Sequence, residues 1–430
     1  MFFTVSKLST TRALQFVQVS RFAVMLVVSI ALAKLSYPIS EIGKYESFLF
    51  ITTFFSQFWF NSILQLLLSN YSTLQTEQER KSLLNYTFTN LLAVSAIISI
   101  AISILGFVTT HNYLYTSVYL FFSVPSMLIE YKLLLEKRSS ALFYFGVFSN
   151  LTTLLLCLFA IFIFHHIVYT IFALILVSLL RFLVSIYLFS NQFSLQFNKL
   201  HITKQIKESL PLMLIFVLGY SVEYIDNFIV LIYCSTEKYA IFRYGAKELP
   251  IVLLLANSLS NSIIPEIANN KTQGLQLLKS ETNKLIHSLF PLSIVLLISS
   301  FWLYPLIFST DFQQSASIFN IYLLLIISRL LFPQSILLAF GDTKLLLQAS
   351  VFEVIVKLIL SIPLFLFFGI YGLAVATVLS YISQKLLMIH FNKHKYHIPI
   401  KEYLHVKLFF FYSSLLIIFF TISRILESYN

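Results

Sequence analysis

The stretch LLAVSAIISIAISILGFV, residues 91–108, is a long run of apolar and small residues without a charged side chain. Apolar runs of about 18 or more residues with few charges are typical of helices that cross a lipid bilayer. Inside a bilayer, only helices and closed β-barrels satisfy their own backbone hydrogen bonds. A barrel strand would alternate apolar and polar side chains over about ten residues, and this stretch does not alternate. It therefore predicts a membrane-spanning helix.

The composition of the whole chain extends this prediction. Of its 430 residues, 58% are hydrophobic and 11% are charged, and the mean hydropathy is +0.85. Soluble proteins carry about 25% charged residues. We therefore expect an all-α polytopic membrane protein with about 12–13 transmembrane helices. The expected spans are 13–35, 46–69, 83–108, 113–135, 140–164, 167–190, 209–233, 247–267, 285–308, 316–339, 345–368, 370–391 and 407–424. Whether residues 407–424 cross the membrane stays open.

The basic residues of the short loops indicate the orientation. If the N-terminus is cytoplasmic, nearly all loop Lys and Arg residues fall on the cytoplasmic side, as the positive-inside rule requires. The loops on the other side, such as residues 110–113 and 310–314, carry almost none. The net charge of +11 is therefore mostly a topological signal with attraction to anionic lipids, and it does not indicate nucleic-acid binding. We expect a multi-pass protein of the cell membrane with a cytoplasmic N-terminus.

Two short sequence pairs indicate an internal repeat. GKYE at 43–46 precedes NSIL at 61–64, and GAKE at 245–248 precedes NSII at 261–264, about 200 residues later. Six spans lie between the two pairs, so both halves would have the same orientation, related by an axis along the membrane normal. We therefore expect an N-terminal six-helix lobe over 1–195 and a C-terminal six-helix lobe over 205–392. A basic cytoplasmic loop and an extra helix would follow over 393–430.

The motifs of several enzyme classes are absent from the sequence. Its three Asp residues, Asp226, Asp311 and Asp342, form no Asp-x-Asp motif, and neither a phosphate-binding loop nor an H-E-x-x-H motif occurs. No loop between the expected spans is long enough for a catalytic domain. We therefore expect no enzyme, no metal site and no resident cofactor, and transport is the leading class.

Charged residues inside the spans are few, and they mark internal paths or partners because each costs about 2.5–3.5 kcal/mol on insertion scales. Glu223 and Asp226 are three residues apart on one helix face. They would repel each other or share a cation, and hydrogen bonding to neighbouring helices is an equal alternative. Glu353 and Lys357, four residues apart, are expected to form an ion pair. Glu130 and Arg181 are expected to snorkel near the ends of their spans.

Three basic residues have no obvious local partner apart from Glu248. These residues are Arg21, Arg243 and Lys247. If helical, Arg243 and Lys247 would project on one face, just before Pro250 begins the next span. Positive charge near a helix N-terminus favours an anion. Snorkelling to lipid phosphates is the alternative. We expect Glu248 to be the local partner that orders this cluster.

Three segments resemble one known family. YIDNFIV at 224–230 and YAIFRYGAKELPIVLLLANSLSNSIIPEIA at 239–268 are similar to the seventh and eighth helices of bacterial polysaccharide flippases of the Wzx type. Residues 13–50 resemble the first two helices of that group. The group lies within the multidrug/oligosaccharidyl-lipid/polysaccharide exporter superfamily. The thirteenth expected span departs from the twelve-helix pattern, and family members with extra C-terminal helices accommodate it.

The resemblance implies a fold and a function. The fold would be two six-helix lobes around a central cavity. The function would be flipping an undecaprenyl-diphosphate-linked glycan from the cytoplasmic to the outer leaflet of the bacterial inner membrane, by alternating access and with ion-gradient coupling, as in an antiporter. Glycan polymerase and other polysaccharide assembly proteins would be partners. A multidrug-type cation-coupled exporter and a membrane-embedded glycan polymerase or transferase are the alternatives.

The resemblance also implies roles for particular residues. Arg21, Arg243 and Lys247 match the basic residues that would hold the diphosphate. Related lipid flippases bind a coupling cation between carboxylates of the seventh and eleventh helices, which would point here to Asp226 and Glu353, with Glu223 nearby. The coupling ion would be Na+ or H+. Lys357, beside Glu353, argues against a sodium site of this type, because it could satisfy the carboxylate or replace the cation.

Overall fold

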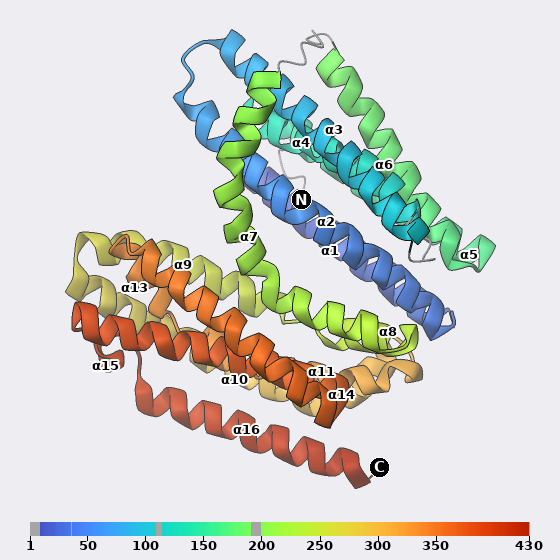
Figure 1. Ribbon diagram of the computed structural model, residues 1–430. Coiled ribbons are helices and arrows are strands. Elements are labelled where there is room, and N and C mark those ends of the chain that lie inside the picture. The colour runs from blue at the N-terminus through green and yellow to red at the C-terminus, as the bar shows by residue number, and fades with distance from the viewer. Residues whose placement is uncertain (1–8, 36, 109–113, 191–198, 430) are drawn as a thin grey trace, which may run out of the picture. The chain divides into compact units, whose positions relative to one another are not determined.

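The computed structural model describes residues 9–35, 37–108, 114–190 and 199–429, and these residues form helices with no β-strand among them (Figure 1). The chain divides into two compact units, Met1–Val217 and Leu218–Asn430. The division falls inside the helix α7 (Lys199–Tyr233). The predicted bounds of the two six-helix lobes, 1–195 and 205–392, stay a prediction.

The first unit is a bundle of long apolar helices. Apolar residues dominate every side of these helices, as expected for segments that face lipid on one side and other helices on the other. Its elements are α1 (Thr10–Lys34), α2 (Ile39–Thr73), α3 (Glu77–Val108), α4 (Leu114–Leu135), α5 (Ser139–Phe164), α6 (Ile167–Ser190) and the first part of α7 (Lys199–Tyr233).

Small and polar residues set the packing of α1 against α5. A Cβ atom on Gly146 of α5 would lie 2.1 Å from a methyl group of Val17 on α1, so only glycine permits this approach. One turn further along α5, the Asn150 side-chain amide donates to the Val17 carbonyl at 3.1 Å and to the Ser20 hydroxyl at 2.6 Å. Small residues and interhelical hydrogen bonds are the usual means of helix association in lipid. They hold α1, and with it Arg21, in a fixed position.

The second unit combines long helices with several short ones. The short elements concentrate polar side chains within the bundle, where irregular backbone is tolerated because protein surrounds it. Its elements are the remainder of α7, α8 (Thr236–Gly245), α9 (Pro250–Asn269), α10 (Lys271–Ile307), the 3-10 helix η2 (Thr310–Phe312), α11 (Gln313–Leu323), α12 (Ile326–Arg329), α13 (Pro333–Ala339), α14 (Thr343–Tyr396), α15 (Ile400–Tyr403) and α16 (Val406–Tyr429).

The segment between α8 and α9 separates Arg243 from Lys247, which would share one helix face only if both were helical. Helix α8 ends at Gly245, four residues follow without helical structure, and α9 begins at Pro250. Gly245 is required because a Cβ there would lie 2.5 Å from the Ser315 backbone oxygen of α11. Pro250 disfavours helical backbone in the residue before it, which keeps the break open. Arg243 therefore lies in the last turn of α8 and Lys247 in the break, not on one helix face.

Helix α14 is a helical hairpin. Its 54 residues would extend about 81 Å as one helix, more than twice the hydrocarbon thickness of about 30 Å. Gly369 interrupts it with a left-handed φ of 58°, and a Cβ on Gly372 would lie 1.9 Å from the Leu364 carbonyl oxygen. The two halves therefore run antiparallel, in orange and red-orange in Figure 1. At the open end, the Asp342 carboxylate accepts hydrogen bonds from Lys395 and Tyr396, and the bond from Lys395 lowers the pKa of Asp342.

The span count agrees with the sequence once this hairpin is taken into account. Among the described residues, eleven helices are long and apolar enough to cross a membrane, or twelve if the bent pair Thr310–Arg329 and Pro333–Ala339 is one span. Dividing α14 at Gly369 gives two segments that are each long enough to span, so all thirteen expected spans correspond to helices. The last of them, residues 407–424, lies in α16, which packs on α10 through the stacked rings of Phe290 and Tyr412 at 5.7 Å. The all-α polytopic membrane fold is confirmed.

Candidate functional site

A buried carboxylate holds two arginines together in the first unit. Glu130, near the middle of the second half of α4, is 3% exposed. One of its oxygens accepts hydrogen bonds from Arg21 of α1 and from Arg181 of α6, the latter at 2.7 Å. The Arg181 guanidinium also lies 5.6 Å from the centre of the Phe145 ring. Two positive charges therefore share one negative charge within a membrane-spanning bundle.

Both arginines line a cavity of about 200 Å³ inside the same unit. Helices α1, α2, α4, α5 and α6 contribute its walls, and no Asp or Glu is among the lining residues that the structure describes. The polar lining side chains besides the two arginines are Thr53, Tyr119, Ser123, Ser126, Asn150, Thr153 and Ser178. Two arginines and one glutamate give the site a formal net charge of +1. The cavity therefore favours an anionic guest.

The arginines also have donors to spare. The Nε groups of Arg21 and Arg181 are buried, and neither finds a hydrogen-bond acceptor among the described residues. Leaving a buried donor unsatisfied costs about 1–3 kcal/mol. A phosphate oxygen would satisfy such donors well, because guanidinium groups bind phosphate through paired N–H groups. Arg21 was expected to contact an anion, whereas Glu130 and Arg181 were expected only to snorkel; the structure instead buries them as the partners of Arg21.

In the second unit, Arg243 and Lys247 have separate surroundings. Arg243 Nη1 lies 3.3 Å from Asn227 Oδ1 and 3.5 Å from Glu223 Oε1, both on α7. The Lys247 ammonium lies 4.8 Å from the centre of the Tyr244 ring. The Glu223 side chain is 63% exposed, so its ion pair with Arg243 is weak by the standard of exposed pairs. The anion-binding roles expected for Arg243 and Lys247 stay predictions.

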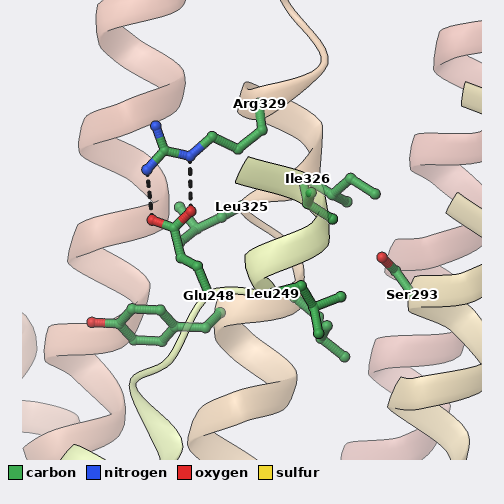
Figure 2. A pocket seen from close by; sticks show the side chains of 9 residues that line it. Glu248, Leu249, Ser293, Leu325, Ile326 and Arg329 are labelled. Atoms are coloured by element: carbon green, nitrogen blue, oxygen red, sulfur yellow. Dashed lines mark hydrogen bonds and ion pairs between the residues drawn. The ribbon is translucent and has the colours of Figure 1, made fainter. Parts of the chain in front are cut away.

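Glu248 pairs with an arginine from another element, which the sequence did not predict. Its carboxylate accepts two hydrogen bonds from Arg329 of α12, at 2.8 Å from Nε and 2.6 Å from Nη2, as Figure 2 shows. The space beside this pair measures about 10 Å³, the lower limit for one water molecule. The Arg329 guanidinium also lies 4.4 Å from the centre of the Tyr381 ring. The sequence missed this pairing because the two residues lie on separate elements. The Glu248–Arg329 pair joins the start of α9 to the broken segment α11–α13.

Asp226 and Glu223 face different partners, although they are three residues apart on α7. Asp226 is 1% exposed, and its Oδ1 lies 2.5 Å from the Lys357 Nζ of α14. Glu353, on the same half of α14 as Lys357, accepts a hydrogen bond from Gln384 of the other half. The expected ion pair between Glu353 and Lys357 is therefore replaced by a pair between Asp226 and Lys357. Among the described residues, no group of three or more His, Cys, Asp or Glu side chains could hold a metal ion.

Comparisons with known proteins give a sequence relative that is named as a flippase. No protein-family model matches the chain. Over 185 residues the chain is 25% identical to a probable low-salt glycan biosynthesis flippase, Agl15, of Haloferax volcanii. The match covers 40% of this chain and 38% of the relative, so well under half of that protein's length is represented.

Solved structures match nearly the whole chain. The inward closed conformation of the lipid II flippase MurJ superposes with a TM-score of 0.66 at 17% identity, covering 96% of this chain and 97% of MurJ. A point mutant of the MATE transporter VcmN of Vibrio cholerae gives a TM-score of 0.54 at 14% identity, covering 93% and 97% of the two chains. The similarity to flippases that the sequence motifs indicated is therefore confirmed, and the chain has the polytopic helical fold that the lipid II flippase MurJ and the MATE transporter VcmN share.

Proposed function

We propose that the protein flips an anionic lipid-linked glycan between membrane leaflets, and that its substrate is an oligosaccharide joined to its lipid by a diphosphate. The observation that supports this most is the cavity of the first unit, which Arg21 and Arg181 line and which has no Asp or Glu among its described lining residues. A probable flippase for glycan biosynthesis is a sequence relative, and a lipid II flippase is among the structures with the same fold. These names support a transporter rather than an enzyme.

Glu130 gives the cavity a property that transport needs. A carrier must hold its substrate and then let it go. Two arginines without a counter-charge would bind a diphosphate too tightly to release it, because charged hydrogen bonds contribute about 1.5–3 kcal/mol each. Glu130 competes with the substrate for the same guanidinium groups. In our proposal the diphosphate displaces part of this ion pairing on arrival, and Glu130 recovers the arginines when the substrate leaves.

We further propose a membrane and an orientation for the chain. The resemblance of its motifs to Wzx-type proteins supports the inner membrane of a bacterium, with alternating access and ion coupling, and the distribution of loop Lys and Arg supports a cytoplasmic N-terminus. The basic segments before α7 and after α14 would then lie on the cytoplasmic side. Net flipping would run toward the outer leaflet, where an assembly enzyme would take up the glycan.

A leaflet-resolved measurement in cells tests the proposed function. Cells that make a lipid-diphosphate-linked glycan would be compared with and without this gene, and an impermeant reagent would modify the glycan exposed on the outer leaflet. We expect the exposed fraction to fall to background without the gene. Arg21→Ala should reduce delivery about tenfold or more, because one charged contact of at least about 1.4 kcal/mol is lost.

Arg138→Ala is the matched control, since its side chain is 60% exposed and its ion pair with Glu136 is long, at 3.8 Å. When it is present in the membrane at the same level as the wild type, this variant should restore delivery of the glycan to the outer leaflet. Equal outer-leaflet delivery with and without the gene would contradict the proposed function. Export of an organic cation instead of the glycan would indicate a multidrug-type exporter.

A further inference from the structure

Lys357 is a fully buried lysine in the second unit whose ammonium group lies among three oxygen atoms. Its Nζ lies 2.5 Å from Asp226 Oδ1, 2.5 Å from Thr377 Oγ1 and 3.2 Å from the Leu373 backbone oxygen. The side chain is 0% exposed and that of Asp226 is 1% exposed. An ammonium group has three donors and no acceptor. Two of these contacts are hydrogen bonds, and the third, to Asp226, is an ion pair.

The acceptors come from both halves of the α14 hairpin and from α7. Gly369 turns the chain so that Leu373 and Thr377 of the second half lie opposite Lys357 of the first half. The Thr377 hydroxyl in turn donates to Asp226 Oδ2 at 2.5 Å. Asp226 therefore meets the Lys357 ammonium through an ion pair at Oδ1 and the Thr377 hydroxyl through a hydrogen bond at Oδ2.

This set of oxygens is one that would hold a small hard cation. Carboxylate, hydroxyl and backbone carbonyl oxygens are the ligands that such cations prefer. Here the ammonium group of the chain itself lies in contact with all three. Asp226 and Lys357 together are neutral, so a second cation placed beside them would be a buried charge without compensation, which is costly. The residues present therefore do not fit a free coupling cation bound at Asp226.

Glu353 does not restore such a site. It lies one helical turn from Lys357, and its carboxylate accepts a hydrogen bond from the Gln384 side chain. Gln384 and Thr377 both lie on the second half of the hairpin. Gln384 donates to Glu353 and Thr377 donates to Asp226, so the two acidic side chains have separate partners. A cation that bridged Asp226 and Glu353 would have to displace the Lys357 ammonium first.

We propose that Lys357 acts as a tethered cation, which fills a monovalent-cation site formed by Asp226, Thr377 and the Leu373 carbonyl and closes that site to free sodium. The oxygen ligands are present and arranged, and the side chain supplies the positive charge. This inference does not depend on the substrate proposed above, because it concerns cation binding in the purified protein. Removal of the Lys357 charge should therefore open the site to sodium.

The test compares sodium binding by the wild-type protein and by Lys357→Ala in detergent. Retention of radioactive sodium would be measured, together with the midpoint of thermal unfolding in sodium chloride and in N-methylglucamine chloride of equal ionic strength. We expect no saturable retention and no sodium-specific shift for the wild type. Lys357→Ala should retain at least about tenfold more sodium, because the vacated oxygens and the Asp226 charge favour a cation. Its unfolding midpoint should rise in sodium.

Two further variants keep the test decisive. Asp226→Asn combined with Lys357→Met removes both charges at similar volume, so it should fold and bind no sodium, since neutral replacement of a buried pair is often tolerated. Lys344→Ala, at the exposed start of α14, controls for the loss of a positive charge elsewhere on the helix. Saturable sodium binding by the wild type would overturn the proposal. The proposal would also be overturned if Lys357→Ala neither retained sodium nor changed its unfolding midpoint in sodium. The same holds if Lys357→Ala were unfolded in sodium while the double variant folded.

Discussion

Glu130 is the residue on which the charge of the first unit's cavity depends. It is buried, and it accepts hydrogen bonds from Arg21 and Arg181, which line that cavity. Breaking a buried ion pair by removing one partner leaves the other charge without compensation, which costs about 3–5 kcal/mol. The same removal leaves two arginines free to bind an external anion. Stability and anion binding should therefore respond in opposite directions to one substitution.

Glu130→Gln is expected to lower the free energy of unfolding by about 3 kcal/mol. Added pyrophosphate should then raise the unfolding midpoint of this variant more than that of the wild type, because the anion replaces the lost carboxylate. Thermal unfolding in detergent, at constant ionic strength, measures both effects. Glu136→Gln is the matched control, since Glu136 is 28% exposed with ion pairs of 3.8 and 4.0 Å. Equal behaviour of the two variants would count against a buried anion site.

At the scale of elements, glycine positions decide where helices meet and where they end. The hairpin of α14 depends on the left-handed Gly369 and on the close approach of Gly372 to the Leu364 carbonyl. That approach brings Thr377 and Leu373 to Lys357. A Cβ at Gly372 would clash with the Leu364 backbone carbonyl. Rotating a side chain cannot relieve a clash with a backbone atom.

Gly372→Ala is therefore expected to destabilise the protein by about 3 kcal/mol or more, at the upper end of the range for overpacked positions. Gly219→Ala, on α7, provides the comparison, because a Cβ there meets no atom within 4 Å. It should be neutral, or stabilising by up to about 1 kcal/mol through its higher helix propensity. Thermal unfolding of the two variants side by side measures the difference. Similar midpoints would show that the hairpin does not need the close approach.

The sequence predicted the elements well and their tertiary partners poorly. Hydropathy places every span, because a bilayer imposes length and composition on each helix independently. Arg21 stood out because it had no neighbour of opposite charge within its own helix. Glu130 lies 109 residues away from it, and Asp226 lies far from Lys357 in sequence. Spacing rules within one helix therefore paired Lys357 with Glu353, whereas burial in the bundle pairs it with a residue of another helix.

At the scale of the whole molecule, the membrane fold, the cavity charge and the flippase relative support the same function. We propose that the protein recognises its lipid substrate by the anionic diphosphate. Reconstituted vesicles offer a direct view of this movement, since they contain no other protein. The lipid-diphosphate-linked oligosaccharide would carry a fluorophore on its glycan, and an impermeant quencher would report the fraction in the outer leaflet.

The decisive comparison is the flipping rate of this glycolipid against that of an analogue in which a neutral linker replaces the diphosphate. We predict that the protein moves the diphosphate-linked form at least about tenfold faster than the neutral form, and that Arg181→Ala removes most of this difference. Equal flipping rates for the two lipids would contradict the proposed role of the diphosphate. So would flipping rates for both lipids that do not exceed those in protein-free vesicles.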